Sequence, residues 1–144
     1  MKNLLRLEEL AQLVLCLFLL IASDVPWWCY LLLALGPDIG MLGYLINSRV
    51  GAIAYNLLHH KGFALSAVIL GSYLPMVRLF EMTDSDWSNY QIIVLAGVIL
   101  YGHASMDRIF GYGLKFGDNF HHTHLGWIGR GKAVDAVREA GQGQ

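Results

Sequence analysis

The chain alternates between long apolar runs and short polar interruptions. Four apolar segments, each bounded by charged or turn-forming residues, occupy residues 10–23, 25–46, 50–77 and 91–106. A helix that crosses a bilayer needs about 20 apolar residues, a length that the first segment reaches if its helix extends back through the leucine-rich start. The pattern predicts an all-α, polytopic membrane protein with about four transmembrane helices.

Two of the four segments contain helix-breaking features. In the second, Gly36 and Pro37 precede Asp38, and because proline removes a backbone donor we expect the helix to break near Gly36. In the third, "YNLLHHKGFAL" interrupts the apolar run, so this segment is either one long tilted helix or a short re-entrant piece followed by a crossing. Interrupted helices in bilayers often mark a binding site, since protein or water must satisfy the freed backbone groups.

The basic residues predict how the chain is oriented. If the N-terminus is cytoplasmic, the basic residues that flank the apolar segments lie on the cytoplasmic side, with the single exception of Arg78. These inner residues are Lys2, Arg6, Arg49, Arg108, Lys115, Arg130, Lys132 and Arg138. We therefore expect a single integral membrane domain over residues 1–130 in a bacterial inner membrane, a polar cytoplasmic tail over residues 131–144, and both termini in the cytoplasm. A cleaved signal peptide is the other interpretation of the first segment, and Glu8 and Glu9 oppose it.

Composition narrows the classes of partner. The chain is 56% hydrophobic and 15% charged, far from the average soluble domain, and its net charge of −1 provides no basic face for nucleic acid. Cys16 and Cys29 both lie in apolar stretches, where buried small side chains are the better interpretation than a disulfide or metal pair. The small residues of "GAIAYN" could pack helices within one chain or between two, so an oligomer is possible.

Ionisable residues recur inside the apolar segments at similar depth. At about 1.5 Å per helical residue, Asp38, His59 and His103 lie about 10–15 Å in from the cytoplasmic ends of three different segments. Asp107 follows His103 by one helical turn, nearer the surface. Such groups cost several kcal/mol each in hydrocarbon unless they face one another or water. We therefore expect them to meet in a shared interior site.

The residue types in this cluster point to a metal. His103 and Asp107 are spaced i, i+4 and share a helix face, while His124 could fold in from the glycine-rich region that follows. The predicted metal ligands are His59, His103, Asp107 and His124. Nitrogen and oxygen donors without a thiolate suit zinc, iron or manganese. With Asp38 as general base or further ligand and Arg108 as a second catalytic candidate, the cluster fits a metal-dependent hydrolase acting on a lipid or another amphiphile.

Other uses of the same residues remain open. His103 and Asp107, with Arg108 neutralising the carboxylate, could simply hold two helices together. His59 and His103 could instead ligate a haem axially, or the cluster could carry ions or protons without catalysis. A structural membrane subunit is a further alternative.

Several short motifs carry a resemblance to a known family. They are Pro37-Asp38, Gly43-Tyr44, Tyr55-Asn56 with His59, His103 with Asp107-Arg108, "GYGLK" at 111–115 and "THLG" at 123–126. Over about residues 4–130 the chain resembles the DUF4260 family of small bacterial integral membrane proteins, a domain of unknown function. The resemblance implies a helical membrane fold and favours His59, His103 and His124 over the other histidines, and it implies no activity. A looser likeness, through an intramembrane Pro-Asp and several histidines, is to inner-membrane metal-dependent hydrolases.

Overall fold

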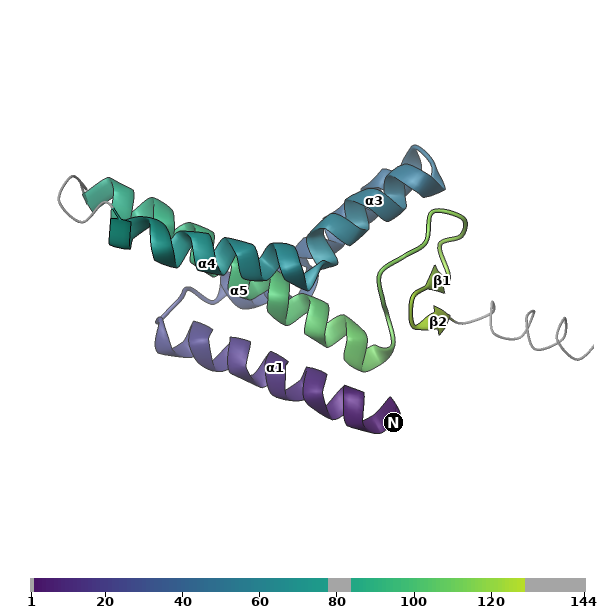
Figure 1. The fold of residues 1–144 in the computed structure, drawn as a ribbon, viewed down its shortest axis with the longest axis horizontal. Coiled ribbons are helices and arrows are strands. Elements are labelled where there is room, and N and C mark those ends of the chain that lie inside the picture. Colours follow the sequence, from purple (N-terminus) through teal and green to yellow (C-terminus); the bar gives the residue numbers. More distant parts are fainter. Residues whose placement is uncertain (1, 78–83, 129–144) are drawn as a thin grey trace, which may run out of the picture.

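The computed structural model describes residues 2–77 and 84–128, and over these residues the protein is predominantly helical (Figure 1). The elements in chain order are α1 (Lys2–Ala22), α2 (Trp28–Leu35), the 3₁₀-helix η1 (Gly36–Leu45), α3 (Ser48–His59), α4 (Lys61–Val77), α5 (Asp84–Phe110), and the two short strands β1 (His122–Thr123) and β2 (Gly126–Trp127). The predicted tail, residues 131–144, lies outside the described residues.

α5 lies at the centre of the helical arrangement. α1 and α4 pack on either side of it, α2 also contacts it, and η1 and α3 pack against each other as a hairpin that extends from the bundle (Figure 1). After α5 the chain turns back toward the η1–α3 hairpin and forms the antiparallel β1–β2 pair. The helical class agrees with the sequence, whereas the β1–β2 pair was not expected.

The second apolar segment changes its helix type at the Gly36-Pro37 pair, where the sequence predicts a break. The last α-helical bond of α2 runs from the Gly36 N–H to the Leu32 carbonyl. The next bond in the ladder would need an N–H at position 37, and Pro37 has none. η1 then continues for ten residues, far longer than usual for a 3₁₀-helix, and such stretches often mark a functional hinge or a sequence under strain.

The third segment is divided into two helices. α3 ends at His59, His60 has an extended backbone (φ −84°, ψ 109°), and α4 begins at Lys61. The start of α3 is capped by Asn47, whose side-chain oxygen accepts a hydrogen bond from the Val50 N–H at 2.9 Å. The polar run that interrupts the apolar pattern therefore marks the point where one helix ends and the next begins.

η1 and α3 approach closely because glycines line their contact. A Cβ added at Gly43 would lie 3.0 Å from the Gly51 Cα atom, and one added at Gly51 would lie 2.2 Å from Cγ of Tyr44. The Tyr44 ring thus occupies the space that a side chain at position 51 would need. This close contact brings the start of η1 alongside the end of α3.

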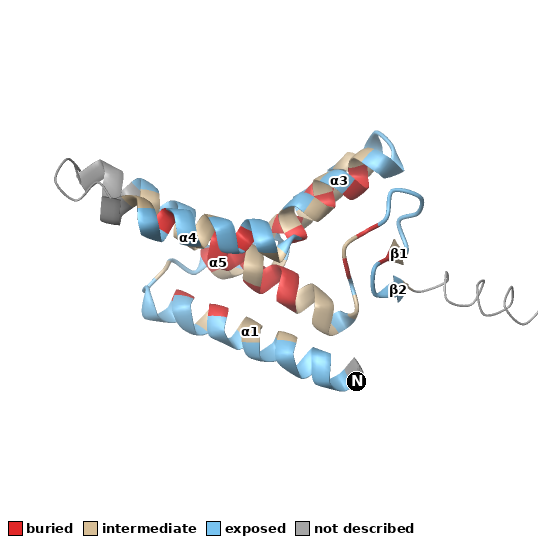
Figure 2. Ribbon diagram, in the orientation of Figure 1, coloured by how far each residue is buried: buried red, intermediate tan, exposed pale blue. Residues whose placement is uncertain are grey.

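The buried core is small, and large apolar side chains cover much of the surface. Its main cluster joins α1, α2 and α5 and consists of Cys16, Leu20, Cys29, Leu33, Val98 and Ile99. Both cysteines are free and buried, as the sequence predicts. One face of α1 contributes to this cluster, whereas the opposite face is exposed along the helix (Figure 2).

Two stretches, Trp28–Leu45 and Asn89–Phe110, are long and apolar enough to cross a membrane, judged by length and composition. The apolar part of α4, Lys61–Leu74, is shorter. Four crossings therefore remain a prediction.

Candidate metal centre

Four ionisable side chains from three elements meet where the two divided segments change direction. Asp38 comes from η1, His59 from the end of α3, and His103 and Asp107 from α5, and one ligand atom of each lies within 4.8 Å of all the others. His103 and His59 are buried, while Asp38 is 37% exposed. The structure thus brings together the residues that depth along the helices predicts to converge.

The two histidines face each other through their Nε2 atoms, which are 3.0 Å apart. His59 Nδ1 donates to the Tyr55 carbonyl at 2.8 Å, and His103 Nδ1 donates to the Leu33 carbonyl at 2.7 Å. Because a carbonyl can only accept, both Nδ1 atoms carry a hydrogen, and each neutral ring then has a bare lone pair at Nε2. Two lone pairs this close need a proton or a metal ion between them, and metal-ligating histidines typically donate their other ring N–H to a carbonyl in this way.

The carbonyl that orients His103 is available because of the helix break. In a continuous α-helix the Leu33 carbonyl would accept from the N–H at position 37, but Pro37 offers none. His103 Nδ1, from α5, supplies the missing donor. The Gly36-Pro37 pair therefore ends α2 and also frees the Leu33 carbonyl to fix the ring of His103, which is 70 positions from Leu33 in the chain.

Carboxylate oxygens complete the cluster around the two Nε2 atoms. His59 Nε2 lies 3.6 Å from Oδ1 of Asp38 and 3.4 Å from Oδ2 of Asp107. His103 Nε2 lies 3.5 Å from Oδ1 of Asp38 and 3.8 Å from Oδ1 of Asp107. Four ligands at about 2.0–2.1 Å from a tetrahedral zinc ion are about 3.3 Å apart. The histidine–carboxylate distances of 3.4–3.8 Å lie near this value, and the four ligand atoms lie within 4.8 Å of one another, so they would have to draw together slightly around one ion.

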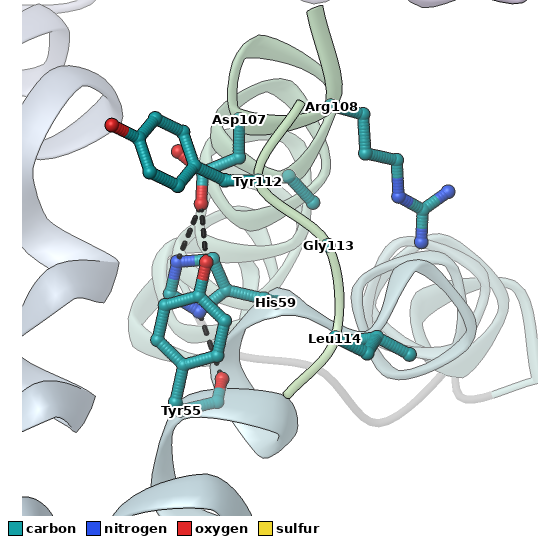
Figure 3. Close-up of a pocket in the computed structure, with 8 residues that line it drawn as sticks. Tyr55, His59, Asp107, Arg108, Tyr112, Gly113 and Leu114 are labelled. Carbon is teal, nitrogen blue, oxygen red and sulfur yellow. Dashed lines mark hydrogen bonds and ion pairs between the residues drawn. The ribbon is translucent and has the colours of Figure 1, made fainter. Parts of the chain in front are cut away.

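Tyr55 supports two of these residues at once. Its hydroxyl donates to Oδ2 of Asp107 at 2.6 Å, and its ring stacks on the His59 ring with centroids 3.7 Å apart (Figure 3). Its backbone carbonyl also receives the His59 Nδ1 hydrogen bond. This tyrosine was not among the predicted site residues, although its i, i+4 spacing from His59 places both on one face of α3.

A family model described as "Domain of unknown function (DUF4260)" matches residues 2–128. The chain belongs to the DUF4260 family. No curated protein and no solved structure matches it. The family carries no assigned activity in its description, so the chemistry of this DUF4260 protein has to be argued from its site.

Arg108, a predicted catalytic residue, lies beside the centre but turns away from it. It lines the same crevice as His59 and Asp107, yet its side chain extends away from them (Figure 3). Its Nη1 lies 3.5 Å from Oε1 of Glu9 on α1, and Glu9 also pairs with Lys61 of α4. In this DUF4260 protein Arg108 joins three helices and does not neutralise Asp107.

His124, a predicted metal ligand, is not among the four clustered residues. Its Nδ1 accepts a hydrogen bond from the Leu114 N–H at 2.8 Å, and the residue is exposed. This bond ties the region around β1 to the segment that follows α5. Asp38, proposed from sequence as a base or a further ligand, instead completes the group of four.

Asn56 fixes that same segment to α3. Its Nδ2 donates to the Lys115 carbonyl at 2.8 Å, and its Oδ1 accepts from the Lys115 N–H at 2.7 Å. The side-chain amide thus pairs with one residue of the segment as a neighbouring strand would. This anchor places residues 112–114 along the small crevice that His59 and Asp107 also line.

Proposed function

We propose that this protein is an integral membrane protein that binds one divalent metal ion through Asp38, His59, His103 and Asp107. The observation that carries the proposal is the pair of Nε2 atoms 3.0 Å apart, each made a lone-pair donor by a carbonyl on the other side of its ring. Two nitrogen and two oxygen donors without a thiolate suit zinc, iron or manganese. The spacing near 3.3 Å favours a four-coordinate zinc site.

The charges of the site support the same conclusion. Asp38 and Asp107 are two carboxylates on otherwise apolar stretches, and neither has an ion pair with Lys or Arg among the described residues. Carboxylates in such surroundings need a nearby positive charge. A divalent cation between the two carboxylates balances both negative charges. A single proton shared by the two histidines balances only one.

The surface supports a membrane location with four crossings. α1 turns Glu9 and Gln12 inward, where Lys61 contacts both, and exposes Leu7, Val14 and other large apolar side chains. This is the reverse of an amphipathic helix in water and is the pattern expected of a helix packed within a bundle in lipid. We propose a bacterial cytoplasmic membrane with both termini in the cytoplasm.

For the reaction, we propose hydrolysis of an ester, amide or phosphoryl bond in a lipid or another amphiphile. A divalent metal held in the site would act as a Lewis acid and make water more acidic. Asp38 is the most exposed of the four side chains, so it is the ligand that an incoming water molecule would displace, and its released carboxylate would then accept that water's proton. His103, which is fully buried, and His59 hold the centre in place.

The haem alternative does not suit this geometry. Axial ligation by two histidines needs their nitrogens on opposite sides of one iron, about 4 Å apart for bonds of about 2.0 Å. The two Nε2 atoms are only 3.0 Å apart, and carboxylate oxygens lie 3.4–3.8 Å from them.

Metal content of the detergent-purified protein tests the proposal. We expect about one zinc, iron or manganese ion per chain by elemental analysis, lost in His103→Ala and Asp107→Asn, and no haem absorbance. His60→Ala is the matched control, because His60 lies next to His59 but is exposed, and within residues 2–77 and 84–128 its side chain accepts a hydrogen bond from the Gly62 N–H alone. His124→Ala should also keep the metal. A protein without stoichiometric metal, or one that keeps it in His103→Ala, would show that the ligand assignment is wrong.

Two further measurements address the finer parts of the proposal. A reporter fused after Gln144 should be active on the cytoplasmic side, and an external signal would overturn the orientation. Hydrolysis of short-chain ester and phosphate amphiphiles should need the bound metal and should fall at least about 100-fold in Asp38→Asn, as expected on removing a general base. Equal rates with and without metal would refute the hydrolase.

A further inference from the structure

Lys115 is a buried cation next to the proposed metal centre. The sequence places it with the basic residues that flank a membrane segment, where an exposed side chain is expected, but the structure leaves it only 4% exposed. Leu114, the residue before it, lines the crevice over His59 and Asp107, and Asn56 holds the Lys115 backbone against α3. The position is therefore fixed by the fold.

The Lys115 ammonium has few acceptors. One hydrogen bond goes from Nζ to the Phe120 carbonyl at 3.0 Å, and in residues 2–77 and 84–128 no carboxylate lies within 4.0 Å. Aromatic faces occupy the rest of its surroundings, with ring centroids at 3.5 Å for Phe120 and 4.9 Å for Tyr55. Such cation–π contacts stabilise the charge but leave two N–H groups without an oxygen.

A second unsatisfied donor belongs to a neighbouring aromatic ring. The hydroxyl of Tyr44 is buried and has no hydrogen-bond partner among the described residues. The Tyr44 ring packs edge-on against Phe120, with centroids 5.0 Å apart, and its centroid is 5.9 Å from Lys115 Nζ. A buried hydroxyl without a partner is rare and usually indicates a ligand, ion or water. The group that would satisfy both residues is one rich in acceptor oxygens.

Electrostatic effects and a shared neighbour link Lys115 to the proposed metal centre. Burial lowers the pKa of the Lys115 ammonium, and the negative charges of Asp107 and then Asp38 partly offset this effect. Tyr55 connects the two places, because Lys115 lies over its ring and its hydroxyl binds Asp107. Once a divalent ion balances the two carboxylates, the positive charge of Lys115 has no counter-charge. The loaded site therefore carries an excess positive charge.

We propose that Lys115, assisted by the Tyr44 hydroxyl, binds an anionic phosphate group of the ligand that occupies the metal centre. This inference rests on the proposed function and adds the substrate class: an amphiphile that carries a phosphate. A phosphate supplies the acceptor oxygens that both donors lack and the negative charge that the loaded site lacks, and lysine is a common point-charge partner of phosphate.

Binding of inorganic phosphate to the full-length, zinc-loaded protein in detergent tests this inference by calorimetry. We expect Lys115→Met to weaken phosphate binding at least about tenfold, since a hydrogen bond to a charged group is lost. Lys115→Arg should stay within about threefold, because it keeps the charge. Tyr44→Phe should weaken binding severalfold, and Arg6→Met, on the exposed side of α1, is the control. Zinc content is measured in every sample and should not change.

The outcomes separate this inference from the proposed function. Wild-type phosphate affinity in Lys115→Met with zinc still bound overturns the inference and leaves the metal centre intact. If the protein binds no metal, the proposed function fails, and phosphate binding that still depends on Lys115 would sustain the anion site alone. Should Lys115→Met not fold, equal phosphate affinity in Tyr44→Phe and wild type overturns it. Nanodiscs of phosphatidylglycerol compared with free phosphate then distinguish a lipid headgroup from the soluble anion as the source.

Discussion

Tyr55→Phe tests whether the hydrogen bond to Asp107 supports metal binding. The substitution removes one oxygen atom and keeps the ring that stacks on His59 at 3.7 Å. The lost bond, from the hydroxyl to Oδ2 of Asp107, is 2.6 Å long, which is typical of a hydroxyl donating to a charged carboxylate. The variant therefore isolates the support of one ligand from the packing around it.

The size of the effect follows from that contact. Partners that orient metal ligands typically contribute about 10- to 100-fold to metal affinity, which corresponds to about 1.4–2.7 kcal/mol. Asp107 also has few other supports, since its remaining close neighbours are the histidines that share the ion. We expect zinc affinity to fall by that factor while stoichiometry stays at about one ion per chain.

Competition with a chromophoric chelator at constant pH measures this change. Tyr101→Phe is the matched control, because the Tyr101 hydroxyl also donates to a side-chain oxygen, that of Gln12, at 3.2 Å and outside the cluster. The control should bind zinc as the wild type does. If Tyr55→Phe lies within twofold of wild type, Tyr55 does not orient Asp107 and the supporting role assigned to it here is incorrect.

Three other perturbations test the η1–α3 hairpin and the segment that follows α5. Gly51→Val should destabilise the protein by about 1–3 kcal/mol, because the valine side chain would overlap the Tyr44 ring at the η1–α3 contact. Gly117→Ala is the control and should leave the thermal midpoint unchanged, because the nearest atom to its new Cβ would be 3.7 Å away. Equal midpoints for the two variants would contradict the packing of η1 on α3. Asn56→Ala removes both bonds to the Lys115 backbone, so amide exchange near Lys115 should accelerate at least about tenfold while α5 stays protected, and unchanged exchange would show that the anchor is elsewhere. The hydrogen bond from His122 lowers the pKa of the Asp118 carboxyl below its ordinary value of 3.8, so the stabilisation it gives is present above that value and is lost as the pH falls through the lowered pKa. Trp127, which stacks on His122, should report this acid transition by fluorescence in a protein whose other tryptophans are Phe, and a transition that persists in Asp118→Asn would assign it to another group.

The convergence of the four ionisable residues could be predicted from sequence because it follows from a general cost. Asp38, His59, His103 and Asp107 lie at similar depth in apolar segments, and charges in such surroundings must find one another. The break at Gly36 was predictable for a similar reason, since it depends on proline chemistry alone. Both inferences rest on local sequence and one energetic rule.

The positions of Arg108, His124 and Lys115 depend on contacts between residues far apart in the chain. Arg108 meets Glu9 across 99 positions, a pairing that no spacing rule indicates. His124 and Lys115 belong to the loop after α5, whose path is set by Asn56 and by the β1–β2 pair. A cluster of glycines and histidines is compatible with many such paths, so the sequence alone could not show that the loop buries its lysine and turns His124 outward.

The missing N–H at Pro37 has a consequence for anyone who would redesign this protein. Replacing Pro37 by a good helix former would regularise the second segment and let the backbone satisfy the Leu33 carbonyl itself. The His103 ring would then compete with a local, always-present donor for its anchor. A stabilised variant chosen only for helical continuity would thus resist heat better while its imidazole lost its fixed tautomer, so thermostability screens on this scaffold should record metal retention beside melting temperature.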